Sequence, residues 1–278
     1  MQVRELRIPP APRLALDVSG AGPLVLFVHG IGGNRGNWRA QLPAFADAYT
    51  AAAMDVRGYG DSDDWDGPLV YADLAHDIAR VMDRFHVQRA HLVGLSMGGR
   101  IAMQFTKLYP QRLGSLTLVD THLSFASLPA PEREQFVRTR REPLLAGKTV
   151  ADIAPVVAAA LAGPFATAAV RRQLEDSIRA LRRDSYLKFL EATVESDTIG
   201  DLGFIDVPTH FVVGECDTLT PPELARRMAA QVRRDDVEVS VIARAGHLSN
   251  LENPDEFNRV VRGFLDRQAR LERANLST

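Results

Sequence analysis

The residue best suited to nucleophilic chemistry is Ser96, at the centre of a G-x-S-x-G pattern over residues 94–98. Apolar residues that favour a strand precede the pattern directly, and a segment with helical spacing follows it. A serine on such a sharp turn has a strained backbone and a presented Oγ, and the flanking glycines let helix and strand approach closely. An ordinary Gly/Ser turn is the alternative, but a strained turn that presents a serine has no evident structural use.

A serine nucleophile needs a neighbouring base, and His247 is the preferred candidate among the seven histidines. It lies in an Ala-Gly-His loop after the predicted strand 237–242, and open α/β sheets place their sites beyond the carboxyl ends of strands. His29 also follows a predicted strand and is the main rival, although a role beside an oxyanion hole suits it better. Packing or surface roles are expected for His76, His86, His91 and His210.

The base in turn needs a carboxylate that orients its ring, and Asp217 is the preferred candidate. Asp217 follows an apolar segment and precedes His247 by 30 residues. The resulting chain order, serine, then aspartate, then histidine, is the order that accompanies this serine motif. Two alternatives stay open, because Glu215 lies in the same loop and Asp120 ends the predicted strand 113–119.

Acyl transfer places negative charge on a carbonyl oxygen, and preorganised backbone N–H groups stabilise that charge. The N–H of Met97 is one expected donor, because it directly follows the serine at the start of a predicted helix. The second donor is expected from Ile31, in the glycine-rich loop 29–34. A phosphate-binding loop is excluded, since no Lys-Ser/Thr pair follows the glycines and the G-x-G-x-x-G pattern is absent.

The composition of the 278-residue chain restricts the other classes of function. Hydrophobic residues make up 46%, enough to bury a full core, and a net charge of −2 gives no general attraction to nucleic acid or anionic membranes. The single cysteine, Cys216, excludes a disulfide framework and a four-cysteine zinc site within one chain. The N-terminus has no apolar signal-peptide region, and residues 156–170 are too weakly apolar to span a bilayer. We therefore expect a cytoplasmic protein.

Short apolar segments alternate with longer amphipathic segments along most of the chain. The predicted strands are residues 23–28, 51–55, 90–95, 113–119, 207–213 and 237–242. The predicted helices are residues 37–48, 71–85, 97–108, 221–232 and about 253–268. This alternation predicts an α/β fold with a mostly parallel sheet and helices on both faces.

The alternation stops between about residues 122 and 200. Prolines divide this stretch into helical segments without a convincing strand. We interpret the stretch as a helical cap, or lid, inserted between two strands of the sheet. The predicted domains are a core of residues 1–121 and 201–278 and a cap of residues 122–200.

Five motifs in order resemble those of the α/β-hydrolase family. They are His-Gly-Ile-Gly-Gly at 29–33 with Trp38, Asp-Val-Arg-Gly-Tyr-Gly-Asp-Ser at 55–62, the Ser96 motif, Gly-Glu-Cys-Asp at 214–217 and Ala-Gly-His at 245–247. The resemblance covers about residues 12–268 apart from the cap. It implies an eight-stranded sheet with a helical cap between the sixth and seventh strands.

The nucleophile separates the subgroups of this family. Haloalkane dehalogenases and epoxide hydrolases carry aspartate there, so Ser96 argues against both. The motifs are most similar to those of 3-oxoadipate enol-lactonases and carboxylesterases, and the Ser-Met-Gly-Gly segment is also similar to C–C bond hydrolases and cofactor-free perhydrolases. The resemblance implies hydrolysis of a small ester or lactone through an acyl-enzyme on Ser96.

Two alternatives to an ester or lactone hydrolase stay open. One is a C–C bond hydrolase of ring-cleavage products, and the other is a non-catalytic small-molecule receptor on the same fold, since fold alone does not settle function. We expect no metal and no organic cofactor, and no nucleic-acid or membrane partner. Homodimer formation stays open.

Four residues are expected to bind substrate around the acyl pocket, with core packing as the alternative for each: Trp38, His122, Leu219 and Leu248. The predicted cap also contains nine arginines, which solvated helix faces explain most simply. The sharper hypothesis is that one or two of them point into the cleft and hold a substrate carboxylate. Arg35 and Arg100 are further candidates outside the cap. The cap arginines are Arg133, Arg138, Arg140, Arg141, Arg171, Arg172, Arg179, Arg182 and Arg183.

Overall fold

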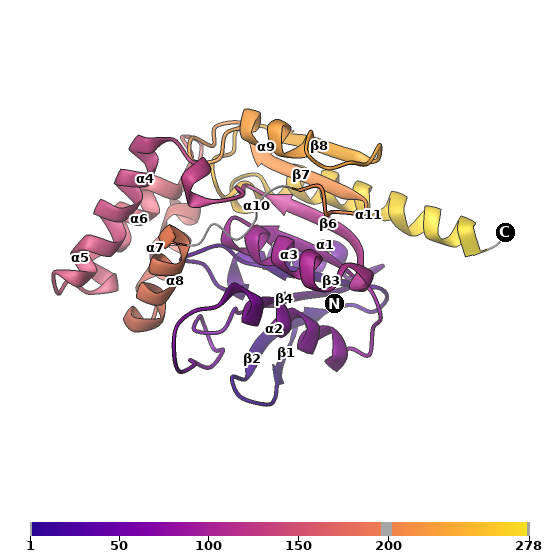
Figure 1. The fold of residues 1–278 in the computed structure, drawn as a ribbon, viewed down its shortest axis with the longest axis horizontal. Coiled ribbons are helices and arrows are strands. Elements are labelled where there is room, and N and C mark those ends of the chain that lie inside the picture. Colours follow the sequence, from indigo (N-terminus) through magenta and orange to yellow (C-terminus); the bar gives the residue numbers. More distant parts are fainter. Residues whose placement is uncertain (1, 196–201, 277–278) are drawn as a thin grey trace.

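The computed structural model describes residues 2–195 and 202–276. Within these ranges eight strands form one sheet in the order β1-β2-β4-β3-β5-β6-β7-β8 (Figure 1). β2 is antiparallel to both of its neighbours, and every other adjacent pair is parallel. The predicted fold class, a mostly parallel eight-stranded sheet, is therefore confirmed. The strands are β1 Arg4–Ile8, β2 Leu14–Ser19, β3 Leu24–Val28, β4 Thr50–Met54, β5 Ala90–Leu95, β6 Leu113–Val119, β7 Thr209–Gly214 and β8 Val237–Ile242.

The central strands β3, β5, β6 and β7 are buried at every position. Their nearly continuous apolar sequences suit strands that are covered on both faces. The edge strand β1 differs, because its first two residues and Arg7 are exposed and its sequence is charged. Searching for apolar runs therefore finds the centre of the sheet and misses β1 and β2.

Helices cover both faces of the sheet. α2 (Tyr71–Arg84) contacts α3 (Met97–Leu108) on one face, and α1 (Gln41–Phe45) contacts α11 (Pro254–Leu276) on the other (Figure 1). The remaining core helices are the short α9 (Pro222–Ala229) and α10 (Ser249–Glu252), with 3-10 turns at Arg35–Trp38 and Pro110–Arg112. α11 continues past the predicted end near residue 268.

The prediction of one continuous helix over residues 37–48 is wrong, because two shorter elements occupy this stretch. A 3-10 turn, Arg35–Trp38, comes first, and its cap is Asn34, whose side chain accepts a hydrogen bond from the N–H of Gly36. The α-helix then begins anew at Gln41. This start places Pro43 in the first turn, where its missing N–H costs no helical hydrogen bond.

The register of the sheet brings five loops to one edge. Val28 pairs with Gly94, Val119 with Val212, and Gly214 with Ile242. The strands β3, β5, β6, β7 and β8 therefore all end at the same edge, and the loops that follow them lie close together. Parallel α/β sheets bind their ligands at this edge.

The described residues between β6 and β7 form helices joined by loops and contain no strand. Its helices gather beside one end of the sheet (Figure 1), and we refer to described residues 122–195 as the cap. The expectation that this stretch lacks strands is confirmed for the described residues, whereas the exact domain boundaries stay a prediction. The cap elements are a 3-10 turn Phe125–Ser127, α4 Ala130–Phe136, a π-helix Val137–Arg141, α5 Glu142–Leu145, α6 Val150–Leu161, α7 Ala168–Arg179 and α8 Arg183–Glu195.

The cap packs on the core through both apolar and ionic contacts. The ring of Phe189 in α8 lies 4.8 Å from that of Tyr59 and 5.6 Å from that of Trp65, centroid to centroid. Nearby, Arg182 pairs with Asp64 at 2.9 Å.

Among the described helices, none combines the length and the hydrophobicity that a membrane-spanning segment needs.

Candidate active site

Ser96 occupies the turn between β5 and α3 with φ 53° and ψ −114°, a conformation that side chains rarely adopt. Glycines make this turn possible. A Cβ on Gly94 would lie 2.4 Å from the carbonyl oxygen of Gly98, and a Cβ on Gly98 would lie 2.2 Å from that of Val28. Both distances are far below van der Waals contact, so the G-x-S-x-G pattern is a steric requirement of this strand–turn–helix geometry.

The predicted nucleophile, base and acid form one hydrogen-bonded chain. Nε2 of His247 lies 3.1 Å from Oγ of Ser96, and Nδ1 of His247 lies 2.9 Å from Oδ2 of Asp217. The three residues come from the loops after β5, β8 and β7, which the sheet register brings together. Because Nδ1 faces a carboxylate, it carries the proton, and Nε2 is left to accept the proton of the serine hydroxyl.

Asp217 is held as a carboxylate by several donors. Its Oδ1 accepts hydrogen bonds from the N–H groups of Leu219 and Thr220, each at 2.9 Å, and the Thr220 hydroxyl donates to Oδ2. Burial opposes ionisation, but the charge and hydrogen bond of His247 and the bonds from Thr220 hold the pKa of Asp217 below its ordinary value. Burial lowers the pKa of His247, but the Asp217 carboxylate outweighs it and raises this pKa above 6.5.

The rival acids have other partners. Asp120 lies beyond β6, and its Oδ1 accepts from the N–H of Gly214 at 2.8 Å. Its Oδ2 accepts from the N–H of Ser249 at 3.0 Å and from the Ser249 hydroxyl at 2.7 Å. Burial, helped by the charge of Asp217, raises the pKa of Asp120 to about 8. Glu215 is exposed and accepts from the N–H of Arg244 at 3.0 Å. Asp120 therefore ties three loops together.

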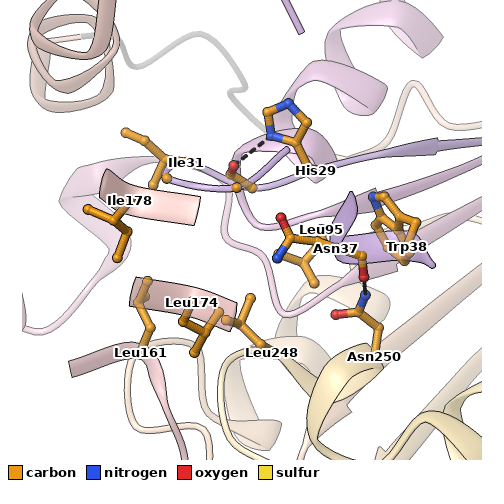
Figure 2. A pocket seen from close by; sticks show the side chains of 13 residues that line it. His29, Ile31, Asn37, Trp38, Leu95, Leu161, Leu174, Ile178, Leu248 and Asn250 are labelled. Atoms are coloured by element: carbon orange, nitrogen blue, oxygen red, sulfur yellow. Dashed lines mark hydrogen bonds between the residues drawn. The ribbon is translucent and has the colours of Figure 1, made fainter. Parts of the chain in front are cut away.

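His29, the rival base, uses both ring nitrogens on the backbone. Nδ1 lies 2.8 Å from the carbonyl oxygen of Gly30, a contact drawn in Figure 2, and Nε2 accepts from the N–H of Val56 at 3.1 Å. Burial lowers the pKa of His29, so the ring stays neutral at pH 7. His29 thus fixes the loop after β3, and its ring nitrogens are not available to Ser96.

The two predicted oxyanion donors lie beside the nucleophile. Met97 is the first residue of α3, where backbone N–H groups have no acceptor inside the helix. Ile31 and Met97 both line a cavity that also contains Ser96 and His247. We call this space, of about 530 Å³, the Ser96 cavity.

The four predicted substrate-binding residues divide between two cavities. His122, Leu219 and Leu248 line the Ser96 cavity. Trp38 instead lines an adjoining space of about 370 Å³, which shares Leu248 with the Ser96 cavity. Figure 2 shows this adjoining space between the loop after β3 and three apolar cap side chains. These cap side chains are Leu161, Leu174 and Ile178.

His122 is a neutral part of the cavity wall. Burial, reinforced by the charge of Arg100, lowers the pKa of His122 to about 3. Its Nδ1 lies 2.8 Å from the carbonyl oxygen of Ser124, and this contact places the proton on Nδ1. His122 therefore adds no positive charge to the cavity at pH 7.

The structure distinguishes the arginines that line the Ser96 cavity from those that lie elsewhere. Arg35 pairs with Asp17, Asp55 and Asp61 away from the cavity, so it holds core loops together. Arg100, in α3, does line the Ser96 cavity. Of the nine cap arginines, Arg140 alone lines this cavity in the described part of the chain.

Two contributing residues escaped the sequence reasoning. Thr220 supports Asp217, and Glu252 accepts from the N–H of Gly246, the residue before the base, at 3.0 Å. An aspartate followed three residues later by threonine is a local turn signal that could have indicated Thr220. No comparable signal exists for the link between Glu252 and the cap, because its partner there, Gly163, is 89 residues away.

Comparison with known proteins agrees with this geometry. The model of the alpha/beta hydrolase fold family matches residues 23–254, and the chain belongs to this family. The dihydrolipoyllysine-residue acetyltransferase component of the acetoin cleaving system of Cupriavidus necator is 32% identical over 257 residues. That match takes in 88% of this chain but 64% of the relative, so the chain spans less than two thirds of that relative's length.

Two further proteins resemble the chain over most of their length. The 3-oxoadipate enol-lactonase 2 of Acinetobacter baylyi is 24% identical, over 88% of this chain and 89% of the enzyme. A thermophilic esterase from Thermogutta terrifontis superimposes with a TM-score of 0.80 at 26% identity, over 96% of this chain and 99% of the esterase.

Proposed function

We propose that this protein is a serine hydrolase that cleaves a small carboxylic ester or lactone. The observation that carries the proposal is the hydrogen-bonded chain from Ser96 through His247 to Asp217, buried beside a cavity. The similarity to an enol-lactonase and to an esterase supports the same reaction class. Serine is a weak nucleophile by itself, and this arrangement supplies the base and the orienting carboxylate that activate it.

In the first half of the reaction, Oγ of Ser96 attacks the carbonyl carbon while Nε2 of His247 takes the hydroxyl proton. The carbonyl oxygen becomes an oxyanion, and in this proposal the N–H groups of Ile31 and Met97 stabilise it, which their place in the wall of the Ser96 cavity supports. When the intermediate collapses, the bond to the leaving oxygen breaks, and Nε2 gives its proton to that oxygen. An ester releases its alcohol, whereas a lactone keeps the new hydroxyl on the acyl group.

In the second half, water attacks the acyl-enzyme and Nε2 of His247 takes its proton. Collapse of the second intermediate returns that proton to Oγ of Ser96 and releases the acid. Asp217 keeps the imidazole in the productive tautomer and stabilises the imidazolium in both halves. Every proton that His247 takes up is passed on within the same half-reaction.

Hydrolysis of p-nitrophenyl acetate by wild type and Ser96→Ala tests the proposal, together with labelling by a fluorophosphonate probe. We expect turnover and labelling in the wild type and the loss of both in Ser96→Ala. Ser240→Ala is the matched control, because this serine lies on β8 beside His210. Absence of labelling and turnover in the wild type would overturn the proposal in favour of a receptor. Labelling without ester turnover, combined with bleaching of a coloured ring-cleavage product, would favour C–C bond hydrolysis.

A further inference from the structure

Arg140 is a buried cation in the wall of the Ser96 cavity. It lies in the π-helix Val137–Arg141, is 4% exposed, and shares the cavity wall with Ser96 and His247. A π-helical turn adds a residue to the helical repeat, and such turns often occur at functional sites. Here both Phe136 and Arg140 line the cavity, while Arg138 between them is exposed.

The charge of Arg140 has no carboxylate partner among the described residues. Its Nη1 donates to the hydroxyl of Thr139 at 3.1 Å, and its guanidinium carbon lies 4.5 Å from the ring centroid of Phe136. The hydroxyl of Tyr186 faces it as well, as a neutral electrostatic and hydrogen-bonding partner. Its buried Nε has no hydrogen-bond partner among the residues that the structure describes. A buried cation held only by neutral groups is costly unless an anion joins it.

The rest of the cavity wall is also suited to an anion. The described residues that line it include Arg100 and Arg140 but neither aspartate nor glutamate. The acids near the base, Asp120, Asp217 and Glu252, accept hydrogen bonds from the surrounding loops and do not line the cavity. Most other lining side chains are apolar, so a bound carboxylate would face Arg140 at low local dielectric, where charge-assisted hydrogen bonds are strong.

We propose that Arg140 binds a carboxylate of the substrate, so that the enzyme acts on anionic esters or lactones small enough for the Ser96 cavity. The inference rests on the function proposed above and specifies its substrate class. The planar guanidinium offers donors in a fixed fork that matches a carboxylate, and its buried Nε is a donor without a partner in the described part of the chain. Substrate anchoring by Arg140 holds the far end of the molecule while Ser96 attacks its carbonyl group.

Binding of glutarate to the Ser96→Ala variant tests the proposal without any turnover. Isothermal titration calorimetry should show one site, with affinity at least tenfold weaker in the double variant Ser96→Ala/Arg140→Met. Arg138→Met in the same background is the matched control, because Arg138 is an exposed arginine of the same helical segment. Neutral glutaramide, of the same length, should show no Arg140-dependent binding.

Arg140→Lys in the Ser96→Ala background keeps the charge and removes the fork. Its glutarate affinity should lie between that of Ser96→Ala and that of Ser96→Ala/Arg140→Met.

Glutarate should also inhibit p-nitrophenyl acetate hydrolysis competitively in the wild type, with an inhibition constant at least tenfold higher in Arg140→Met. Absence of glutarate binding, equal affinity in the Arg140→Met and Arg138→Met backgrounds, or non-competitive inhibition would overturn the proposal. Arg140-dependent binding in a protein that hydrolyses no ester would instead refute the proposed reaction alone.

Discussion

The carboxylate of Glu252 in α10 accepts a hydrogen bond from the backbone N–H of Gly163 in the cap, with both oxygens at 3.1 Å. The same carboxylate accepts from the N–H of Gly246, directly before His247. Gly163 and Gly246 are also in close backbone contact, since a Cβ on Gly163 would lie 2.6 Å from the nitrogen of Gly246. One side chain therefore connects the cap to the loop that carries the base.

Glu252→Ala should destabilise the fold and slow catalysis. Two backbone N–H groups lose their acceptor, which costs about 1–3 kcal/mol in the free energy of unfolding. A small displacement of His247 should lower kcat/KM by about 10- to 100-fold. Urea unfolding and p-nitrophenyl acetate kinetics measure the two effects. Glu223→Ala, on the exposed face of α9, should change stability by less than about 0.5 kcal/mol. Equal effects of the two substitutions would contradict the role of Glu252.

Asp217→Asn should show that this residue, rather than its neighbour Glu215, orients the base. An amide stabilises the wrong imidazole tautomer and cannot balance the imidazolium charge, so kcat should fall by about 10⁴-fold. Glu215→Gln is the matched control, because Glu215 is exposed in the same loop. Its kcat should stay within about twofold of wild type. A large loss in Glu215→Gln with little loss in Asp217→Asn would reverse the assignment.

The pH dependence of the wild type should report the state of His247. The base acts only when neutral, and the Asp217 carboxylate raises its pKa above 6.5. The value of kcat/KM should therefore decrease as the pH falls through a midpoint above 6.5. In Asp217→Asn the raising charge is gone and burial lowers the pKa, so the midpoint of the residual activity should move to lower pH. Coincident midpoints in the two proteins would argue against this coupling.

Asp120→Asn should change both stability and its pH dependence. The folded protein holds a proton on Asp120 up to a pKa of about 8, whereas the unfolded chain releases it near 3.8. Wild-type stability should therefore fall as the pH rises from about 4 to 8, by up to about 1.4 kcal/mol per pH unit from this group. The amide introduced by Asp120→Asn does not titrate, and its NH₂ group replaces an oxygen that accepts from a backbone N–H, so that N–H loses its acceptor at a cost of about 1–3 kcal/mol.

The stability deficit of Asp120→Asn relative to wild type should consequently shrink between pH 5 and pH 8. Urea unfolding at several pH values measures this difference. Asp83→Asn, at an exposed pair with Arg112, is the control and should show a pH-independent offset. Parallel stability curves for wild type and Asp120→Asn would show that Asp120 does not hold a proton in the folded state.

Gly98→Ala should prevent formation of the serine turn. The added Cβ would lie 2.2 Å from the carbonyl oxygen of Val28 in β3, and neither backbone can move without disturbing the sheet. We expect a loss of more than about 3 kcal/mol in the free energy of unfolding and no fluorophosphonate labelling. Gly263→Ala is the control, because the new methyl group would contact only Arg267 at 3.5 Å and should favour α11 by up to about 1 kcal/mol.

The local sequence predicted the structure correctly wherever a single property of neighbouring residues, such as continuous hydrophobicity or the absence of a Cβ, determines the backbone conformation. The apolar runs of β3, β5 and β6 predicted the sheet centre, and the glycines around Ser96 predicted its turn. β1 was missed because its exposed edge position allows the charged residues Arg4 and Glu5, which hide the strand pattern. An edge strand is defined by the neighbour it pairs with, which lies outside the local window.

The sequence predicted the helices of the cap, but it did not predict which of their side chains face the cavity. The expected period of 3.6 residues is interrupted by the π-helical turn, so counting along the helix does not select Arg140 from the nine cap arginines. Asp120 and Glu252 likewise depend on partners 94 and 89 residues away. Such contacts follow from the tertiary arrangement of loops and leave no pattern in the sequence near either residue.

The proposed triad, Ser96, Asp217 and His247, lies on loops that follow strands of the sheet, whereas Phe136 and Arg140 extend from the inserted helices. The proposed carboxylate anchor is thus encoded apart from the proposed triad, although Leu219 and Leu248 of the core also line the cavity. Selection can vary residues 136–161 to recruit a new substrate without disturbing the proton transfers that any ester requires. The same separation gives protein engineers a place to change what the enzyme accepts while its chemistry stays fixed.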